Sequence, residues 1–85
     1  MERFTVKLAD GTYAAADGCS SDEIVQKLAK FENMYDTLCR EHDKVIADME
    51  KLRLAGKSKT VTYKQLLANK MMIMELISRF DIYGL

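Results

Sequence analysis

Apolar residues recur at alternating steps of four and three along one long stretch of the chain. The full set is Ile24, Leu28, Phe31, Tyr35, Leu38, His42, Val45, Met49 and Leu52. A repeat averaging 3.5 residues predicts one long helix with a single apolar seam, in which only His42 is polar. Because such a seam must be covered by the rest of the chain or by another protein, the covering partner is the central question for this sequence.

The composition indicates one small folded domain. The chain has 85 residues, of which 48% are hydrophobic and 31% charged, and it contains no proline. Domains of this size bury a low fraction of their surface, so we expect association to add to stability. Two cysteines, Cys19 and Cys39, are too few for a disulfide framework. With no apolar leader at the start and charges throughout the most apolar stretch, residues 66–85, we expect a soluble cytoplasmic protein that does not enter a membrane.

The zero net charge hides an uneven distribution. Residues 1–50 carry a net charge of −5, whereas residues 51–85 carry +5. Between Lys51 and Met74 there are six basic residues and no acid. This asymmetry favours antiparallel or head-to-tail association of copies, or attraction of an anionic partner to the basic half.

Residues 3–16 have the pattern of a β-hairpin. Alternating apolar residues precede Asp10-Gly11, a pair typical of a two-residue type I′ turn. Closure on that turn would pair Leu8 with Tyr13 and Val6 with Ala15, placing apolar groups of both strands on one face. An isolated hairpin is unstable in water, so we expect this face to pack on a helix.

Capping signals delimit two helices, at residues 21–55 and 63–83. Ser20 and Glu23 form a capping box at the start of the first, and Gly56 is suited to end it. A basic turn at 57–62 follows. Thr62 and Gln65 repeat the capping-box pattern, although residues 60–63 also suit a short strand added to the hairpin.

We therefore predict an α+β fold in which the hairpin packs on an antiparallel pair of helices. The second helix spans roughly 30 Å and the first roughly 50 Å, which leaves part of the seam uncovered. The second helix is also apolar on several sides. We expect a homo-oligomer, most simply a dimer, or another protein to cover this surface. The predicted oligomer interface comprises Leu28, Phe31, Tyr35, Leu38, His42, Met71 and Met74.

The basic turn is the main candidate binding site. It comprises Lys57, Ser58, Lys59, Thr60 and Lys64, around the predicted start of the second helix. Free backbone N–H groups at such a terminus favour an anion, which suggests contact with phosphate, nucleic acid or an acidic protein surface. The alternative is a solvated loop, or salt bridges to the acidic half of a neighbouring copy.

His42 has two interpretations. It is a polar seam residue of the kind that fixes helix register, and at an interface its protonation would weaken association below about pH 6. Alternatively, two copies of Cys39 and His42 meeting in a dimer would make a tetrahedral zinc site. One chain supplies only two ligands, so we predict no metal and no cofactor. With one histidine and no glycine-rich phosphate loop, we also predict no enzymatic activity.

Several segments resemble small uncharacterised proteins encoded by phages and mobile elements of Gram-positive bacteria. The segments that carry the resemblance are residues 2–5 (ERFT), 10–13 (DGTY), Cys19, 27–32 (KLAKFE) and 59–67 (KTVTYKQLL). The resemblance implies an accessory protein that acts by binding, including inhibition of a host defence component. We therefore expect a non-catalytic protein-binding module that works as a helical oligomer. The alternative is a nucleic-acid or nucleotide-binding protein that uses the basic turn.

Overall fold

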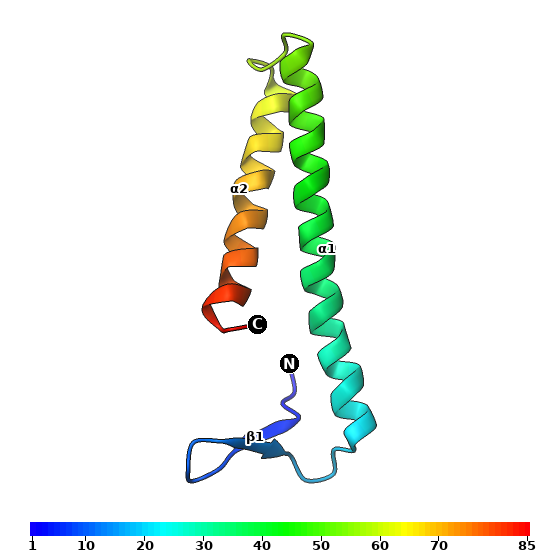
Figure 1. Cartoon of the computed structure of the whole chain (residues 1–85), viewed down its shortest axis with the longest axis vertical. Helices are drawn as coiled ribbons and strands as arrows, with labels where there is room; N and C mark the ends of the chain where they lie inside the picture. The colour runs from blue at the N-terminus through cyan, green and yellow to red at the C-terminus, as the bar shows by residue number, and fades with distance from the viewer. The chain divides into compact units, whose positions relative to one another are not determined.

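The computed structural model describes residues 1–85, with two strands followed by two helices (Figure 1). The elements are β1 (Thr5–Lys7), β2 (Tyr13–Ala15), α1 (Ser21–Leu54) and α2 (Val61–Ile82). Residues 1–33 form one compact unit, with the hairpin and the start of α1, and residues 34–85 form a second, with the remainder of α1 and all of α2. The predicted α+β class, with an antiparallel hairpin and two packed helices, is confirmed.

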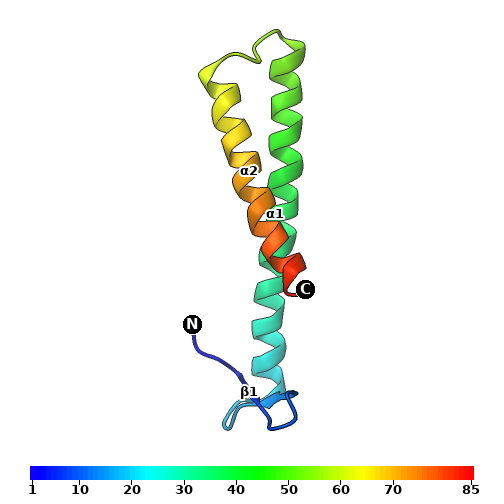
Figure 2. The ribbon, with the colours of Figure 1, turned by 90° about the vertical axis from the view of Figure 1, so that its left-hand side faces the viewer.

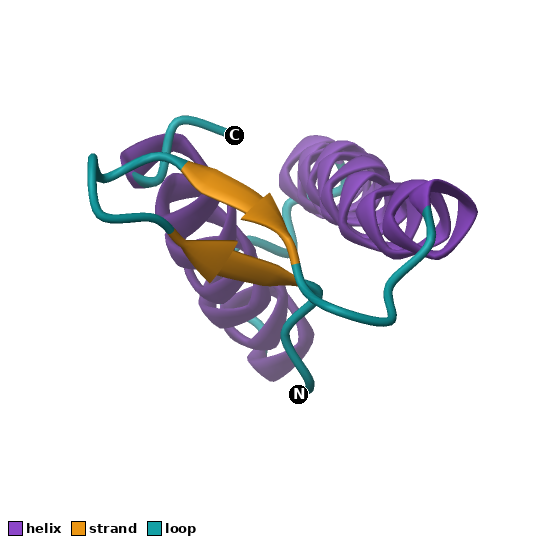
Figure 3. Ribbon diagram, turned by 90° about the horizontal axis from the view of Figure 1, so that it is seen from below, coloured by secondary structure: helices purple, strands orange, loops and turns teal.

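The hairpin has a different register from the predicted one. The two strands are antiparallel (Figure 3). Val6 pairs with Ala14 and Lys7 with Tyr13, so the predicted pairing of Val6 with Ala15 is wrong by one residue. A shift of one residue moves a side chain to the opposite face of a strand. Tyr13 therefore lies on the face opposite Val6, and the apolar face of the hairpin contains Val6 with Ala14 instead of Val6 with Tyr13 and Ala15.

The turn explains this register. Its three residues are 9–11: the Leu8 N–H donates to the Thr12 carbonyl at 2.7 Å, and the Gly11 N–H donates to the Leu8 carbonyl at 3.1 Å. The predicted type I′ turn needs positive φ at both Asp10 and Gly11, but only Gly11 has it, at 88°. Asp10 instead accepts hydrogen bonds from the N–H and hydroxyl groups of Thr12, at 2.9 and 2.6 Å. The three-residue loop, unlike the predicted two-residue turn, thus needs positive φ only at Gly11.

Within residues 1–33, the hairpin is attached to the start of α1 through Lys27. Its ammonium group lies 4.0 Å from the centre of the Phe4 ring and donates to the carbonyl of Glu2. The predicted capping box is present: the Glu23 N–H donates to Ser20 Oγ at 3.1 Å, and the Glu23 carboxylate accepts from the Ser20 N–H at 3.4 Å.

The end of α1 is close to the predicted one, but α2 begins earlier than expected. Gly56, with φ of 72°, ends α1 in a Schellman arrangement, because the Lys57 N–H donates to the Leu52 carbonyl at 2.8 Å. The cap of α2 is Thr60, whose Oγ1 accepts from the Tyr63 N–H at 3.3 Å. The prediction of Thr62 as the cap is therefore wrong, and residues 61–63 are helical rather than a strand.

Residues 34–85 form a helical hairpin, in which α2 runs back along α1 from the turn (Figures 1 and 2). Leu38 and Met49 of α1 and Ile73 of α2 are its most buried side chains. Tyr35 and Phe80 add an edge-to-face contact, with ring centres 5.6 Å apart. The seam between Tyr35 and Leu52 is thus covered to a large extent by the chain itself.

Candidate interaction surface

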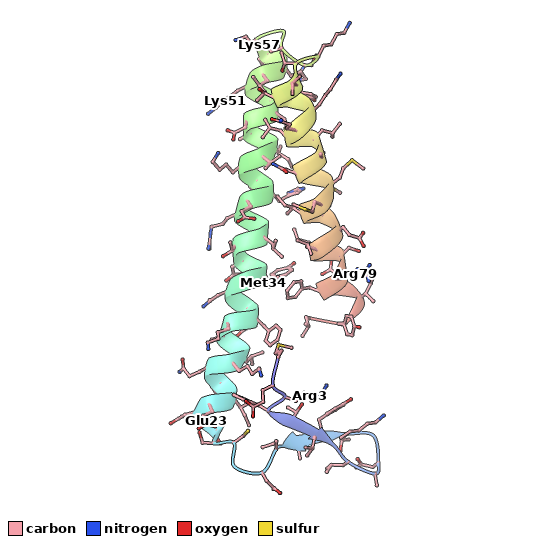
Figure 4. The ribbon with its side chains drawn as sticks, turned by 180° about the vertical axis from the view of Figure 1, so that it is seen from behind. Arg3, Glu23, Met34, Lys51, Lys57 and Arg79 are labelled. Atoms are coloured by element: carbon pink, nitrogen blue, oxygen red, sulfur yellow. The ribbon has the colours of Figure 1, made fainter.

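The basic turn is fully exposed and ordered by backbone hydrogen bonds. The Lys57 carbonyl accepts from the N–H and hydroxyl groups of Thr60, at 3.3 and 2.7 Å. Lys57, at the turn in Figure 4, Lys59 and Lys64 form no ion pair, whereas Arg53 is paired with Glu50. Ser58 is exposed beside them. The turn therefore presents three uncompensated positive charges to solvent.

The residues predicted for an oligomer interface divide into two groups. Leu38 is buried, and Tyr35 and His42 are half-buried, within the helical hairpin of residues 34–85. Phe31 is half-buried within residues 1–33. Exposed members are Leu28, Met71 and Met74. Of the seven predicted residues, only these three therefore expose large apolar surface to a partner.

Only one stripe of α2 is covered. Its members occur at alternating steps of three and four, and are Tyr63, Leu66, Lys70, Ile73, Ile77 and Phe80. The position following each of them is exposed: Lys64, Leu67, Met71, Met74, Ser78 and Asp81. The central three are apolar, with 40% of Leu67, 65% of Met71 and 49% of Met74 accessible to solvent. This second apolar side of α2, which we expected another copy or another protein to cover, is thus exposed in one chain.

On α1 too, the positions that directly follow the covered residues form a stripe of their own. The covered stripe of α1 in the second unit is Tyr35, Leu38, His42, Val45, Met49 and Leu52, with Cys39 and Asp48 also half-buried beside it. The positions that follow the stripe are Asp36, Cys39, Asp43, Ile46, Glu50 and Arg53, of which all but Cys39 are exposed. One residue corresponds to about 100° around a helix. Since both helices are right-handed and antiparallel, these following positions lie on the same side of the helical hairpin. We call the twelve positions, six from each helix, the outer face.

Charge separates along the α2 side of the outer face, which carries Lys64 beside the turn and Asp81 at the opposite end. The α1 side carries three acids, Asp36, Asp43 and Glu50, and one base, Arg53, which is paired with Glu50. At the end that carries Asp81, a hydrogen bond with the Cys39 side chain raises the pKa of Tyr35, with further contributions from the negative charges of Asp81 and Asp36. On α2 the outer face therefore has an apolar centre between a basic and an acidic end, whereas on α1 it is mainly acidic and its apolar residue is Ile46.

The structure brings together no group of three or more histidine, cysteine, aspartate or glutamate side chains able to hold a metal ion. His42 Nδ1 has a single nearby carboxylate, Asp43, at 3.8 Å. None of the helices combines the length and the apolar character needed to cross a membrane. Comparison with protein-family models, curated proteins and solved structures gave no match.

Several residues of the outer face were not identified from the sequence, notably Leu67, Ile46 and Asp81. For Leu67 and Asp81, the signal that would have found them is the covered stripe of α2, with its alternating steps of three and four. For Ile46 it is the apolar seam of α1, whose member Val45 precedes it. Lys70 occupies one position of the α2 stripe and makes it hard to recognise by hydropathy. Lys70 is nevertheless half-buried, as expected for a long side chain whose methylene groups pack while its ammonium group reaches solvent.

Proposed function

We propose that this chain is a non-catalytic protein-interaction module that acts as a helical oligomer through its outer face. The observation that carries the proposal is the exposed apolar centre of this face, formed on α2 by Leu67, Met71 and Met74. Contiguous apolar surface of this kind is typical of a contact site for another protein. Methionine side chains are flexible and polarisable, so they suit a surface that adapts to its partner.

The test compares two exposed methionines on opposite flanks of α2. Met71 belongs to the outer face, whereas Met72, 59% accessible, lies on the other flank. We expect M71E to abolish binding of protein partners, measured by affinity capture together with the native mass of the captured complex, while M72E retains it. Equal binding by the two variants would contradict the proposal. Because of the resemblance to phage-encoded proteins, we also propose that a host protein, such as a defence component, is among the partners.

A second candidate function is binding of nucleic acid or nucleotide phosphate by the basic turn. The favouring observation is the absence of ion pairs at Lys57, Lys59 and Lys64. Three phosphate contacts predict that log Kd rises with log salt concentration at a slope of about 2.7 for duplex DNA and about 2.1 for single-stranded DNA. Fluorescence anisotropy with duplex and single-stranded DNA measures this slope. The variant K57E/K59E, which leaves the outer face unchanged, is expected to bind neither; an unaltered affinity would exclude this function.

A further inference from the structure

The positions of the outer face are symmetric along each helix. On α2 the successive steps between them are three, four, three, four and three, a series that reads the same in both directions. An antiparallel copy of α2 therefore matches this series position for position. In that register Lys64 lies opposite Asp81, Leu67 opposite Ser78 and Met71 opposite Met74. Unlike charges meet at both ends, and methionines meet at the centre.

The contribution of α1 has the same symmetry. Its positions also follow steps of three, four, three, four and three, so that in an antiparallel pair Asp36 lies opposite Arg53. The contact of Tyr35 with Phe80 aligns the two helices of one chain. At 1.5 Å per residue, this contact places the midpoints of the two series within about 3 Å of the same level. A single twofold axis therefore relates both α1 and α2 of one chain to the same helices of the second copy.

From this pattern we propose that the outer face of one chain packs against the outer face of a second copy. In this dimer α2 runs antiparallel to α2 of the second copy, and Lys64 lies opposite Asp81 of that copy. The inference rests on the proposed function, because it names the partner for the same surface. It describes an isologous dimer in which two helical hairpins form a four-helix arrangement.

Charge distinguishes this arrangement from the other way of stacking two helical hairpins. In that alternative, α2 lies on α1 of the second copy at the same level, and Asp81 faces Asp36. These two carboxylates already lie close enough to one group, the Tyr35 hydroxyl, to raise its pKa together. Like charges at that position oppose the alternative, whereas the antiparallel arrangement places the unpaired Lys64 opposite Asp81 at both ends of the α2 contact.

The outer face offers apolar surface from both helices for such a dimer. On α2, 40% of Leu67, 65% of Met71 and 49% of Met74 are accessible, and on α1 41% of Ile46 is accessible. A standard protein interface buries about 800 Å² per partner, so the contact extends along both helices of each copy.

A charge-exchange experiment tests the register. Sedimentation velocity over a concentration series is expected to show a dimer for the unaltered chain. K64E and D81K each place like charges at both ends, and we expect each to raise the Kd about tenfold. Both changes suit the helix dipole, so neither is expected to disturb α2. The matched control K30E makes the same charge change at an exposed lysine of α1 that belongs neither to the outer face nor to the basic turn, and it is expected to leave the Kd unchanged.

Mixing the variants makes the test specific. In a heterodimer of K64E with D81K, the two substituted positions face each other with opposite charges at one end. At the other end the unaltered Lys64 faces the unaltered Asp81, so the mixture is expected to recover nearly the original Kd. The double variant K64E/D81K is expected to recover it in a homodimer. A monomeric unaltered chain, or a mixture no tighter than either variant alone, would overturn the proposed dimer.

The outcomes also separate this inference from the proposed function. A monomeric chain whose M71E variant loses a different protein partner would refute the dimer and leave the interaction module standing. A dimer with the expected charge exchange, combined with capture that is identical for M71E and M72E, would support the dimer and refute binding of other proteins at this face.

Discussion

The helical hairpin depends on a small core, so truncation of one central side chain has a large calculated effect. Ile73 is the most buried residue of α2, with 6% of its surface accessible. Ile73→Ala removes three carbon atoms, which corresponds to about 2.4 kcal/mol of lost transfer free energy. The cavity that remains brings the expected loss to about 3 kcal/mol. Domains of this length have a free energy of unfolding of about 4–13 kcal/mol. The variant is therefore expected to retain about 1–10 kcal/mol of that free energy.

Met71→Ala is the matched control, because it also removes three heavy atoms from α2 but at a position that is 65% accessible. Only about a third of that loss is expected in the monomer, under about 1 kcal/mol. Urea denaturation and thermal denaturation, both followed by circular dichroism at low-micromolar protein concentration, measure the loss of stability in each variant. We expect the Tm of Ile73→Ala to fall by about 10–20 °C. Equal losses for the two variants, or a loss under about 1 kcal/mol for Ile73→Ala, would refute this account of the core.

Three further predictions concern local structure. Thr60→Ala is expected to cost about 1 kcal/mol by removing the cap of α2, whereas Thr62→Ala should be nearly neutral in urea denaturation; the reverse order would restore the sequence-based assignment. Gly56→Ala should cost about 1–2 kcal/mol, because φ is positive there while a Cβ would meet open space, and Gly56→Asn should cost less; a neutral Gly56→Ala would exclude a left-handed residue at this position. The hydrogen bonds from Thr12 hold the pKa of Asp10 below its usual value of 3.8, so Asp10 stabilises the hairpin above that pH and the effect disappears as pH falls through the lowered pKa. An NMR titration of the Thr12 amide should show this transition, and Asp10→Asn should not.

The sequence alone determined the features that depend on a few neighbouring residues. The capping box at Ser20, the end of α1 at Gly56 and the existence of both helices were predicted within one or two residues. These features are set by hydrogen bonds between groups at most five positions apart and by glycine at positive φ. The presence of a hairpin at residues 3–16 also followed from local alternation.

Other features depended on the choice between local alternatives. Asp10-Gly11 suits two turn types, and the hydrogen bonds from Thr12 to Asp10 accompany the longer loop and its shifted register. Likewise Thr60 and Thr62 both suit a helix cap, and the structure uses Thr60. In each case the sequence offers two arrangements of similar local energy.

The covered face of α2 was decided by tertiary structure. The sequence shows apolar residues around much of α2, and hydropathy does not distinguish Ile73 from Met74 as the residue to be buried. Packing against α1 selects the stripe that contains Ile73 and Phe80, because a helix with one neighbour covers only one side. That selection leaves Met71 and Met74 exposed and thereby forms the outer face, which no pattern within α2 alone specifies.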